Sequence, residues 1–336
     1  MIGEKTTEEL PVVFSMGDPH GIGPEVFLKA LPTSRSSGIS PIIFGDAQYL
    51  ERLGQDLGLD APLEQVEVIT TARYEYPPPW GKVEARAGHF ALRCLEDAVA
   101  YCLDQDLPLL VTCPVNKRAM HLAGSSGAGQ TELVASFFPG SDPVMTFFSD
   151  RMRVLLATTH IPLKNVPLVL DKDDLIRKTE IFIQALHQIG ISRPQLAVCG
   201  LNPHASEEGL FGTEEKTILE PVVRTLCRRH GRDIISGPFP SDTLFPKVLA
   251  NQFDGVIALY HDQGLIPLKM VAFESAVNVT LGLPLIRTSP DHGTAFEIAG
   301  SGVADSRSME AAIRWGVKMA SARMGSTTKK ADPLTR

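Results

Sequence analysis

"DGVIALYHDQGLIPLK" (254–269) indicates most directly which fold the chain adopts. The apolar run 256–259 leads straight into the polar residues 260–263, and a second apolar run follows. Continuous apolar strands, as opposed to alternating ones, are typical of parallel sheets that are covered on both faces. In such sheets the functional side chains lie beyond the carboxyl ends of the strands. The stretch therefore predicts a buried strand that delivers His261 and Asp262 to a site.

Similar apolar runs recur along the chain, and longer segments with helical periodicity separate them. The expected strands are 11–16, 41–44, 107–113, 152–159, 195–200 and 254–260. The expected helices are 86–103, 172–190, 214–231 and 308–324, with Pro221 kinking or dividing the third. Strands that alternate with helices predict an α/β fold with mostly parallel sheets.

The length of 336 residues predicts about two domains. The loop 123–132 is the most Gly- and Ser-rich interior stretch, so we expect the chain to cross between domains there. A second crossing is expected near 265–275. These crossings predict one α/β domain made of residues 1–128 and 270–336, and a second, inserted α/β domain made of residues 129–269.

The composition is that of an ordinary globular protein, with 43% hydrophobic residues, 21% charged residues and a net charge of −7. The basic residues are scattered, which argues against nucleic acid or an anionic membrane as a partner. The first ten residues lack the features of a signal peptide, and no apolar run approaches the length of a membrane span, so we expect a cytoplasmic protein. The five cysteines form no CxxC pair, which predicts reduced core thiols.

Three of the nine histidines directly follow expected strands: His160, His204 and His261. One such histidine is more often structural, but three imidazoles with open positions for water or substrate form a catalytic set of the zinc type. Asp242 and Asp262 are candidates for a further ligand or for orienting an imidazole. The spacing matches no local metal motif, so geometry has to decide.

"MGDPHGIGPE" (16–25) raises the possibility of a dinucleotide fingerprint, because Gly21 and Gly23 open a helix and Asp46 follows the next strand. Pro24 and the residue at position 26 break that pattern. The alternative is a tight turn with Pro24 at the first helical position and an acidic residue in the first turn. We favour the turn.

Two cations directly follow apolar runs, as expected of groups that bind an anion. Arg287 lies in "VNVTLGLPLIRTSPDHGTAFEIAGSG" (277–302), and its forked guanidinium can bind a carboxylate or phosphate in bidentate fashion. Lys269 follows "GLIPL" in the same way. Either cation alone is better explained as a salt-bridged surface residue.

Seven stretches together resemble, in order and along nearly the whole chain, the 4-hydroxythreonine-4-phosphate dehydrogenase family of vitamin B6 biosynthesis. They are "GDPHGIGPE" (17–25), "CPVNK" (113–117), "TTHIPL" (158–163), "CGLNPHASEEGLFGTEE" (199–215), "SDTLF" (241–245), "YHDQGLIPLK" (260–269) and "VNVTLGLPLIRTSPDHGTAFEIAG" (277–300). The resemblance implies two α/β/α domains like those of isocitrate and isopropylmalate dehydrogenases, with the active-site cleft between them. It thereby argues against the Rossmann interpretation.

The resemblance also implies a reaction. A divalent metal (zinc, magnesium or cobalt) and NAD or NADP would serve the oxidation of 4-phosphohydroxy-L-threonine to 2-amino-3-oxo-4-phosphooxybutanoate, which loses carbon dioxide to give 3-amino-2-oxopropyl phosphate. The implied assembly is a homodimer with each active site at the subunit interface. His160 and His204 of one subunit, with His261 of the other, would bind the metal. Asp242, Asp262 or Lys269 would handle the proton.

The resemblance further assigns residues to the two bound molecules. Those expected to contact substrate are Gln130, Thr131, Lys269, Asn278 and Arg287, and those expected to contact the dinucleotide are Asn202, Asp291, His292, Gly293 and Thr294. Two positions depart from the family pattern: Gln130 replaces a histidine that contacts substrate, and His20 replaces a small residue. A carboxamide cannot hold a proton near neutral pH.

Because of that departure, a related substrate remains the alternative within the family, such as 4-phospho-erythronate, 4-phospho-threonate or a cis-dihydrodiol carboxylic acid. Two rival classes lie outside it. One is a metal-dependent hydrolase or aldolase that uses the three histidines without a dinucleotide. The other is a non-catalytic binding protein built on the same fold, in which the histidines hold no metal.

Overall fold

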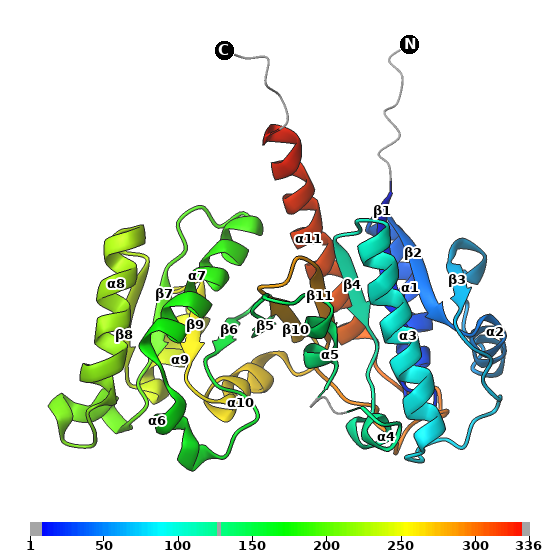
Figure 1. Ribbon diagram of the computed structural model, residues 1–336, viewed down its shortest axis with the longest axis horizontal. Helices are drawn as coiled ribbons and strands as arrows, with labels where there is room; N and C mark the ends of the chain where they lie inside the picture. Colours follow the sequence, from blue (N-terminus) through cyan, green and yellow to red (C-terminus); the bar gives the residue numbers. More distant parts are fainter. Residues whose placement is uncertain (1–8, 126–128, 331–336) are drawn as a thin grey trace, which may run out of the picture. The chain divides into compact units, whose positions relative to one another are not determined.

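The computed structural model describes residues 9–125 and 129–330, and the expected α/β class is confirmed. The chain divides into two compact units (Figure 1). Unit 1 comprises Met1–Ser141 and Leu283–Arg336, and unit 2 comprises Asp142–Gly282. The boundaries were expected after residues 128 and 269, and both expected positions precede the observed ones, after Ser141 and Gly282. Residue 269 lies inside a helix of unit 2.

Unit 1 contains a sheet with the strand order β3-β2-β1-β4-β11. Every strand pair described in it is parallel, as the continuous apolar runs predicted. All residues of β4 and β11 are buried, so these two strands lie in the core. The strands are β1 (Leu10–Ser15), β2 (Ile39–Gly45), β3 (Glu67–Thr70), β4 (Leu109–Thr112) and β11 (Ile286–Pro290).

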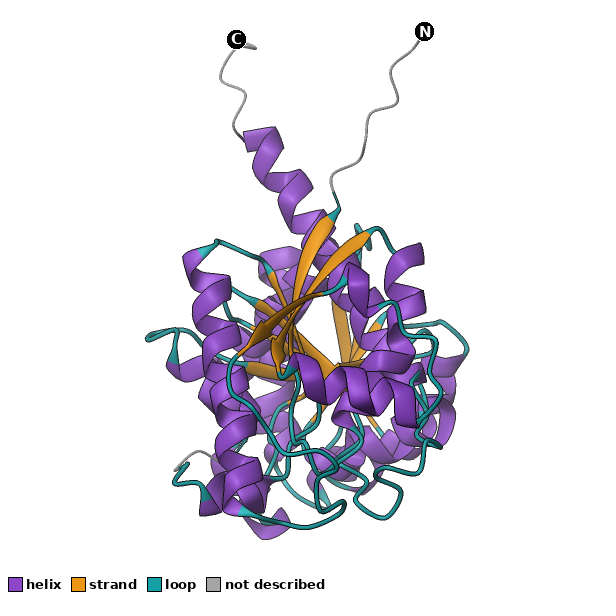
Figure 2. Ribbon diagram, turned by 90° about the vertical axis from the view of Figure 1, so that its right-hand side faces the viewer, coloured by secondary structure: helices purple, strands orange, loops and turns teal. Residues whose placement is uncertain are grey.

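The helices of unit 1 pack on this sheet and on one another. α3 packs against β1, β2 and β4, while α1 and α11 pack together and contact β2 and β11 respectively. Figure 2 shows helices flanking the strands. The helices are α1 (Gly23–Ser36), α2 (Ala47–Asp56), α3 (Ala85–Asp104), α4 (Lys117–Leu122), α5 (Gln130–Ser136) and α11 (Arg307–Lys330), with a short 3₁₀ turn, η1 (Leu63–Gln65).

Unit 2 contains a mixed sheet with the strand order β10-β5-β6-β9-β7-β8. β6, β9, β7 and β8 are parallel, whereas β5 runs antiparallel to both β6 and β10. The two antiparallel pairs were not expected, because an apolar run does not reveal the direction of its strand. The strands are β5 (Val144–Phe148), β6 (Arg153–Leu156), β7 (Leu196–Cys199), β8 (Ile235–Phe239), β9 (Gly255–Ala258) and β10 (Val277–Leu281).

The helices of unit 2 include the division expected at Pro221. A π-helical turn, η4 (Glu215–Leu219), ends just before α8 (Glu220–His230), which carries the proline in its first turn. α7 packs against α8, and α10 packs against β6 and β9. The remaining elements are α6 (Val166–Val169), α7 (Lys172–Gln188), α9 (Ser241–Leu249), α10 (His261–Ala272), η2 (Leu163–Asn165) and η3 (Pro203–Gly209).

The second half of the stretch 254–269 is helical. α10 begins at His261, with Tyr260 in an extended conformation as its N-cap. Leu265 and Leu268 are buried, whereas Ile266 is exposed, which is helical spacing. A short apolar run does not distinguish a strand from a buried helix by itself, so the sequence left this element open. The chain passes back to unit 1 only after Gly282.

Two further expectations concern the whole chain. In the part of the chain that the structure describes, no helix is both long and apolar enough to cross a bilayer. The five cysteines are free, and all but Cys227 are buried. Burial raises the pKa of Cys102 and of Cys199 to about 12, so these thiols stay protonated near neutral pH, as befits core residues.

The close packing of α10 on its sheet predicts the effect of a methyl group at Gly264. A Cβ there would lie 2.8 Å from side-chain atoms of both Leu156 and Val154. We expect Gly264→Ala to lower the free energy of unfolding by about 1–3 kcal/mol, measured by chemical denaturation. Gly54→Ala in α2 is the control, because its nearest neighbour, Leu28, is 3.8 Å away. Equal stability of the two variants would contradict this account of the packing.

Candidate active site

Two of the three strand-end histidines lie together in unit 2. His160 follows β6 and His261 follows β9, and these neighbouring strands are parallel. The ring centres are 5.9 Å apart, with an angle of 43° between the ring planes. Both residues line a cavity of about 340 Å³, which Leu163 and Tyr260 also border. The parallel strand ends therefore bring two imidazoles to one cavity.

Asp262 orients the imidazole of His261. Its Oδ1 lies 2.7 Å from Nδ1 of His261, which is hydrogen-bond distance. A carboxylate on Nδ1 favours the tautomer with its proton there, and leaves Nε2 as the nitrogen that can bind an ion. This contact places Asp262 where it can orient the imidazole of His261.

His204 lies on a different element, the η3 turn after β7. It is the first of five consecutive residues, 204–208, with φ between 46° and 75°. Each non-glycine residue in this left-handed conformation costs about 1–2 kcal/mol. Backbone strain of this kind is concentrated at functional sites. The ring of His204 lies beside Phe211, with 6.4 Å between the ring centres.

Glu215 holds the chain that leads into this strained turn. Its Oε1 accepts hydrogen bonds of 2.8 Å from the backbone N–H groups of both Leu201 and Asn202. The amide nitrogen of Asn202 donates to carboxylate oxygens of Glu214 and Glu215, at 2.9 Å each. Asn202, expected to contact the dinucleotide, therefore has a structural role in fixing the His204 loop.

The described part of one chain does not bring three candidate ligands together. Within residues 9–125 and 129–330, no three His, Cys, Asp or Glu side chains converge where they could hold an ion. Asp242 is exposed in the first turn of α9. The resemblance assigns His160 and His204 to one subunit and His261 to the other; within the described chain, the rings of His160 and His261 lie together.

Arg287 forms the centre of a buried cationic site in unit 1. Its side chain lies at the end of the sheet between β4 and α5, and Thr112 Oγ1 accepts from Nε at 3.0 Å and from Nη2 at 2.6 Å. Burial lowers the pKa of Arg287 to about 10, which still leaves the guanidinium charged at neutral pH. A buried, charged fork of this kind suits a phosphate or carboxylate.

Gln130 and Thr131, at the start of α5, complete the surroundings of Arg287. Thr131 Oγ1 lies 3.4 Å from Nη1, and Gln130 Oε1 lies 3.2 Å from Nη2. The amide nitrogen of Gln130 donates to the carbonyl of Cys113 at 3.0 Å. Three of the residues expected to contact substrate are therefore brought together in unit 1, with Thr112 as a member that the sequence did not single out.

The other two expected substrate residues belong to unit 2. Lys269 lies in the last turn of α10, with its Nζ 5.9 Å from the ring centre of Phe273. Asn278 lies in β10, and its Oδ1 is buried without a hydrogen-bond partner in the described part of the chain. A buried acceptor without a partner favours a ligand donor at that point.

The loop expected to contact the dinucleotide, 291–300, is hydrogen-bonded to the loop between β1 and α1. The carbonyl of Thr294 accepts a hydrogen bond from the N–H of Ile22 at 3.0 Å. A Cβ at Gly21 would lie 2.8 Å from Cβ of Thr294, so only glycine allows this approach. His292 Nδ1 lies 3.0 Å from the carbonyl of Gly293, and the N–H of Asp291 donates to Ser308.

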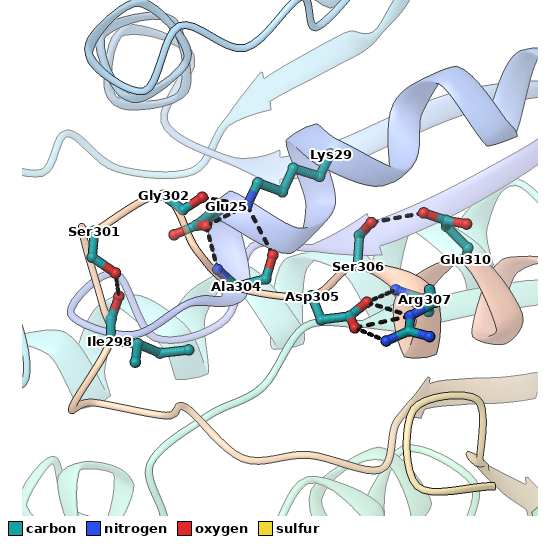
Figure 3. Close-up of polar contacts among 10 residues, drawn as sticks. All are labelled: Glu25, Lys29, Ile298, Ser301, Gly302, Ala304, Asp305, Ser306, Arg307 and Glu310. Atoms are coloured by element: carbon teal, nitrogen blue, oxygen red, sulfur yellow. Dashed lines mark hydrogen bonds and ion pairs between the residues drawn. The ribbon is translucent and has the colours of Figure 1, made fainter.

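Glu25 and Lys29 anchor the far end of the same loop to α1, as Figure 3 shows. Glu25 is buried, and its Oε1 accepts from Lys29 Nζ at 2.7 Å and from the N–H of Ala304 at 2.8 Å. Lys29 also donates to the carbonyls of Gly302 and Ala304. The sequence did not single out Lys29, since the two carbonyls that it binds lie more than 270 residues away in the chain.

These contacts support the tight-turn interpretation of "MGDPHGIGPE". α1 begins at Gly23 with Glu25 in its first turn, as expected. Asp46 is not available for a ribose, because Oδ1 caps α2 through the N–H of Gln48 and binds Arg73 at 2.9 Å, while Oδ2 accepts from the N–H of Tyr74. Gly21 and Asp46, which resemble parts of a dinucleotide fingerprint, instead make contacts with a loop and with the start of α2.

The chain is thus a two-unit α/β protein, in which unit 2 carries paired strand-end imidazoles and unit 1 carries a buried guanidinium. The sequence profile of the family described as "Pyridoxal phosphate biosynthetic protein PdxA" matches residues 38–316, and the chain belongs to this family. D-threonate 4-phosphate dehydrogenase of Cupriavidus necator is 40% identical, with 94% of this chain and 99% of the relative covered. 4-Hydroxythreonine-4-phosphate dehydrogenase of Desulfosudis oleivorans is 40% identical, with 91% and 95% covered.

A solved structure agrees with the sequence relatives. The crystal structure of 4-hydroxythreonine-4-phosphate dehydrogenase from Klebsiella pneumoniae is 37% identical and superimposes with a TM-score of 0.80, covering 94% of this chain and 99% of that one. The family resemblance inferred from the seven sequence stretches is thereby confirmed.

The anchor in Figure 3 predicts that Lys29→Met loosens the loop 291–304. The variant removes three hydrogen bonds and leaves the Glu25 carboxylate buried without its cation, so we expect a loss of about 1–3 kcal/mol in unfolding free energy. Hydrogen exchange of the loop amides should accelerate. Glu25→Gln combined with Lys29→Met is the control, because removing the carboxylate charge as well should restore part of the stability. Unchanged exchange in Lys29→Met would contradict the anchor.

Proposed function

We propose that the chain is a metal-dependent and NAD(P)-dependent dehydrogenase that oxidises the secondary hydroxyl of a phosphorylated four-carbon acid in the cytoplasm. The first candidate substrate is 4-phosphohydroxy-L-threonine, with 2-amino-3-oxo-4-phosphooxybutanoate as the product, which decarboxylates to 3-amino-2-oxopropyl phosphate. The observation that carries the proposal is the pairing of the His160 and His261 rings, with Asp262 on the second imidazole.

The paired imidazoles fit a divalent metal. Two imidazoles that bind one ion at about 2 Å place their ring centres about 5–6 Å apart, and the observed separation is 5.9 Å. Two nitrogens do not complete a site, and His204 is the remaining strand-end imidazole. We propose that His204 comes from a second copy of the chain, which accounts for the incomplete set in one chain.

The residues of the chain would divide the chemistry between them. When bound, a divalent metal lowers the pKa of a substrate hydroxyl and polarises a carbonyl, and NAD or NADP accepts the hydride. Arg287, held by Thr112 and Gln130, would bind the phosphate and so fix the reacting carbon. Asp242, Asp262 or Lys269 would carry the proton, and Asp262 has a second carboxylate oxygen besides the one that lies against His261.

The remaining expected contacts are part of the same proposal. Thr131, Lys269 and Asn278 would contact the substrate, and Asn278 has the buried Oδ1 to accept from it. Asp291, His292, Gly293 and Thr294 would contact the dinucleotide, in the loop that Glu25 and Lys29 anchor. Asn202 would contact the dinucleotide from the chain that leads into His204, where its amide nitrogen donates to Glu214 and Glu215.

An exposed apolar surface in unit 2 supports the homodimer. Ile266 and Met270 on α10 and Phe273 at its C-cap are 59%, 80% and 71% exposed, and their spacing puts them on one face of the helix. Leu168 and Leu210, which follow His160 and His204 by fewer than ten positions in the chain, are 80% and 74% exposed. Large exposed apolar surfaces mark interfaces with other molecules. A second copy covers them, because the site also needs a third imidazole.

Mixing experiments test which histidines share a chain. His160→Ala and His204→Ala dimers should each be inactive, but subunit exchange between them should restore about a quarter of wild-type activity, since half the dimers then hold one intact site of two. A mixture of His160→Ala and His261→Ala should stay inactive, because both residues belong to the same half-site. Activity at 340 nm and bound metal are both measured.

The reverse result would contradict the proposed division of the histidines between the subunits. Recovery in the His160→Ala and His261→Ala mixture, with none in the His160→Ala and His204→Ala mixture, would mean that His160 and His204 share a subunit, as the resemblance implied. Full metal content and turnover in His261→Ala alone would remove the metal assignment itself.

A second candidate substrate is D-threonate 4-phosphate, because a relative named for it is as similar as one named for 4-hydroxythreonine 4-phosphate. We expect reduction of NAD or NADP with 4-phosphohydroxy-L-threonine, followed at 340 nm. Gln130→His should add a pH dependence near 6.5 to kcat/KM that the wild type lacks, since the carboxamide does not titrate.

The outcomes separate the alternatives. Turnover of D-threonate 4-phosphate alone would replace the first candidate by the second. No change at 340 nm with either substrate would favour a metal-dependent hydrolase or aldolase when the protein holds metal, and a non-catalytic binding protein when it holds none.

A further inference from the structure

Gln263, two residues after His261 in α10, is a buried side chain whose polar atoms reach three other segments of unit 2. Its Oε1 accepts from the N–H of Leu259 at 2.6 Å. Its Nε2 donates to the carbonyl of Gly200 at 2.7 Å and to Oγ of Ser241 at 2.9 Å. The acceptor and both amide hydrogens of the carboxamide are therefore engaged.

Each partner of Gln263 lies at the end of a strand that leads to a candidate functional residue. Leu259 follows β9 and precedes His261, whereas Gly200 follows β7 and precedes His204. Ser241 follows β8 and precedes Asp242. One carboxamide thus joins three of the four parallel strand ends of unit 2.

The fourth parallel strand is joined to the same network. Thr158, which follows β6 and precedes His160, donates from Oγ1 to the carbonyl of Leu259 at 2.7 Å. Ser241 Oγ also lies 3.2 Å from the carbonyl of Gly200. Every strand that bears a candidate ligand or proton carrier is therefore connected, directly or through one further bond, to Gln263.

We infer that Gln263 is a positioning residue for the metal: it sets the spacing of the strand ends that carry His204, Asp242 and His261. This inference rests on the proposed function, because the metal belongs to that proposal. No other side chain of this length offers one acceptor and two donors without charge. Glutamate lacks the donors that Gly200 and Ser241 accept from, and methionine lacks all three bonds.

A purely structural role predicts a different pattern of effects. If Gln263 only stabilised the core, its loss would lower the melting temperature and leave the metal affinity of the folded protein unchanged. If it positions the strand ends, the loss weakens metal binding beyond what an equally destabilising substitution does. Partners that orient metal ligands typically change metal affinity by about 10–100-fold.

The test uses the full chain freed of metal and titrated with Co²⁺ against a chelator of known affinity. Gln263→Met should raise the apparent Kd for Co²⁺ at least about tenfold and alter the visible absorption spectrum of bound Co²⁺. Activity should recover in part when Co²⁺ is raised to saturation. Thr146→Val is the matched control, because Thr146 is also buried in unit 2 but donates to Val279, away from the four strand ends.

Gln263→Glu decides the matter if Gln263→Met does not fold, since it keeps the size of the side chain and the acceptor for Leu259. Wild-type affinity and an unchanged Co²⁺ spectrum in a folded Gln263 variant would overturn the inference. An equal loss of affinity in Thr146→Val would overturn it too, by showing a general effect of stability. Absence of Co²⁺ binding by the wild type would instead refute the metal in the proposed function, and the inference with it.

Discussion

The four parallel strands of unit 2 end at one edge of their sheet, and the buried polar groups there must find partners within the protein. A buried N–H or carbonyl without a hydrogen-bond partner costs about 1–3 kcal/mol, which is a large fraction of the free energy of unfolding of a typical protein. Gln263 and Thr158 supply those partners for Leu259 and Gly200. These hydrogen bonds fix the strand ends. They also help to place the three histidines, because each histidine lies within four residues of a strand end that such a bond holds.

The same edge explains which parts of the site the sequence revealed. His160, His204 and His261 were found because each follows an apolar run, and an apolar run shows where a strand ends. The pairing of His160 with His261 was not predicted. β6 and β9 are neighbours in the sheet, although about 100 residues separate them in the sequence. Strand order depends on how distant segments pack together, so it cannot be predicted from local periodicity. For the same reason the antiparallel direction of β5 went unpredicted.

Arg287 shows the same limit in unit 1. Its position after an apolar run indicated an anion-binding cation, and the exposed salt bridge was the simpler alternative. The decisive fact is burial against Thr112, a residue 175 positions earlier. The apolar run itself was taken as one stretch, yet it forms β10 and β11 in different units, separated by a turn at 282–285. Length and composition of the run do not show that break.

Gln130 determines whether the charge beside Arg287 changes with pH. A neutral imidazole there has one donor and one acceptor, enough for the Cys113 carbonyl and the Arg287 guanidinium, as the carboxamide has. A protonated imidazole would lose its acceptor and set a second positive charge beside Arg287. Near pH 6.5 a histidine would therefore alternate between holding the guanidinium and repelling it. The carboxamide does not titrate over the same range, so the acceptor for Arg287 and the charge beside the guanidinium stay constant near neutral pH.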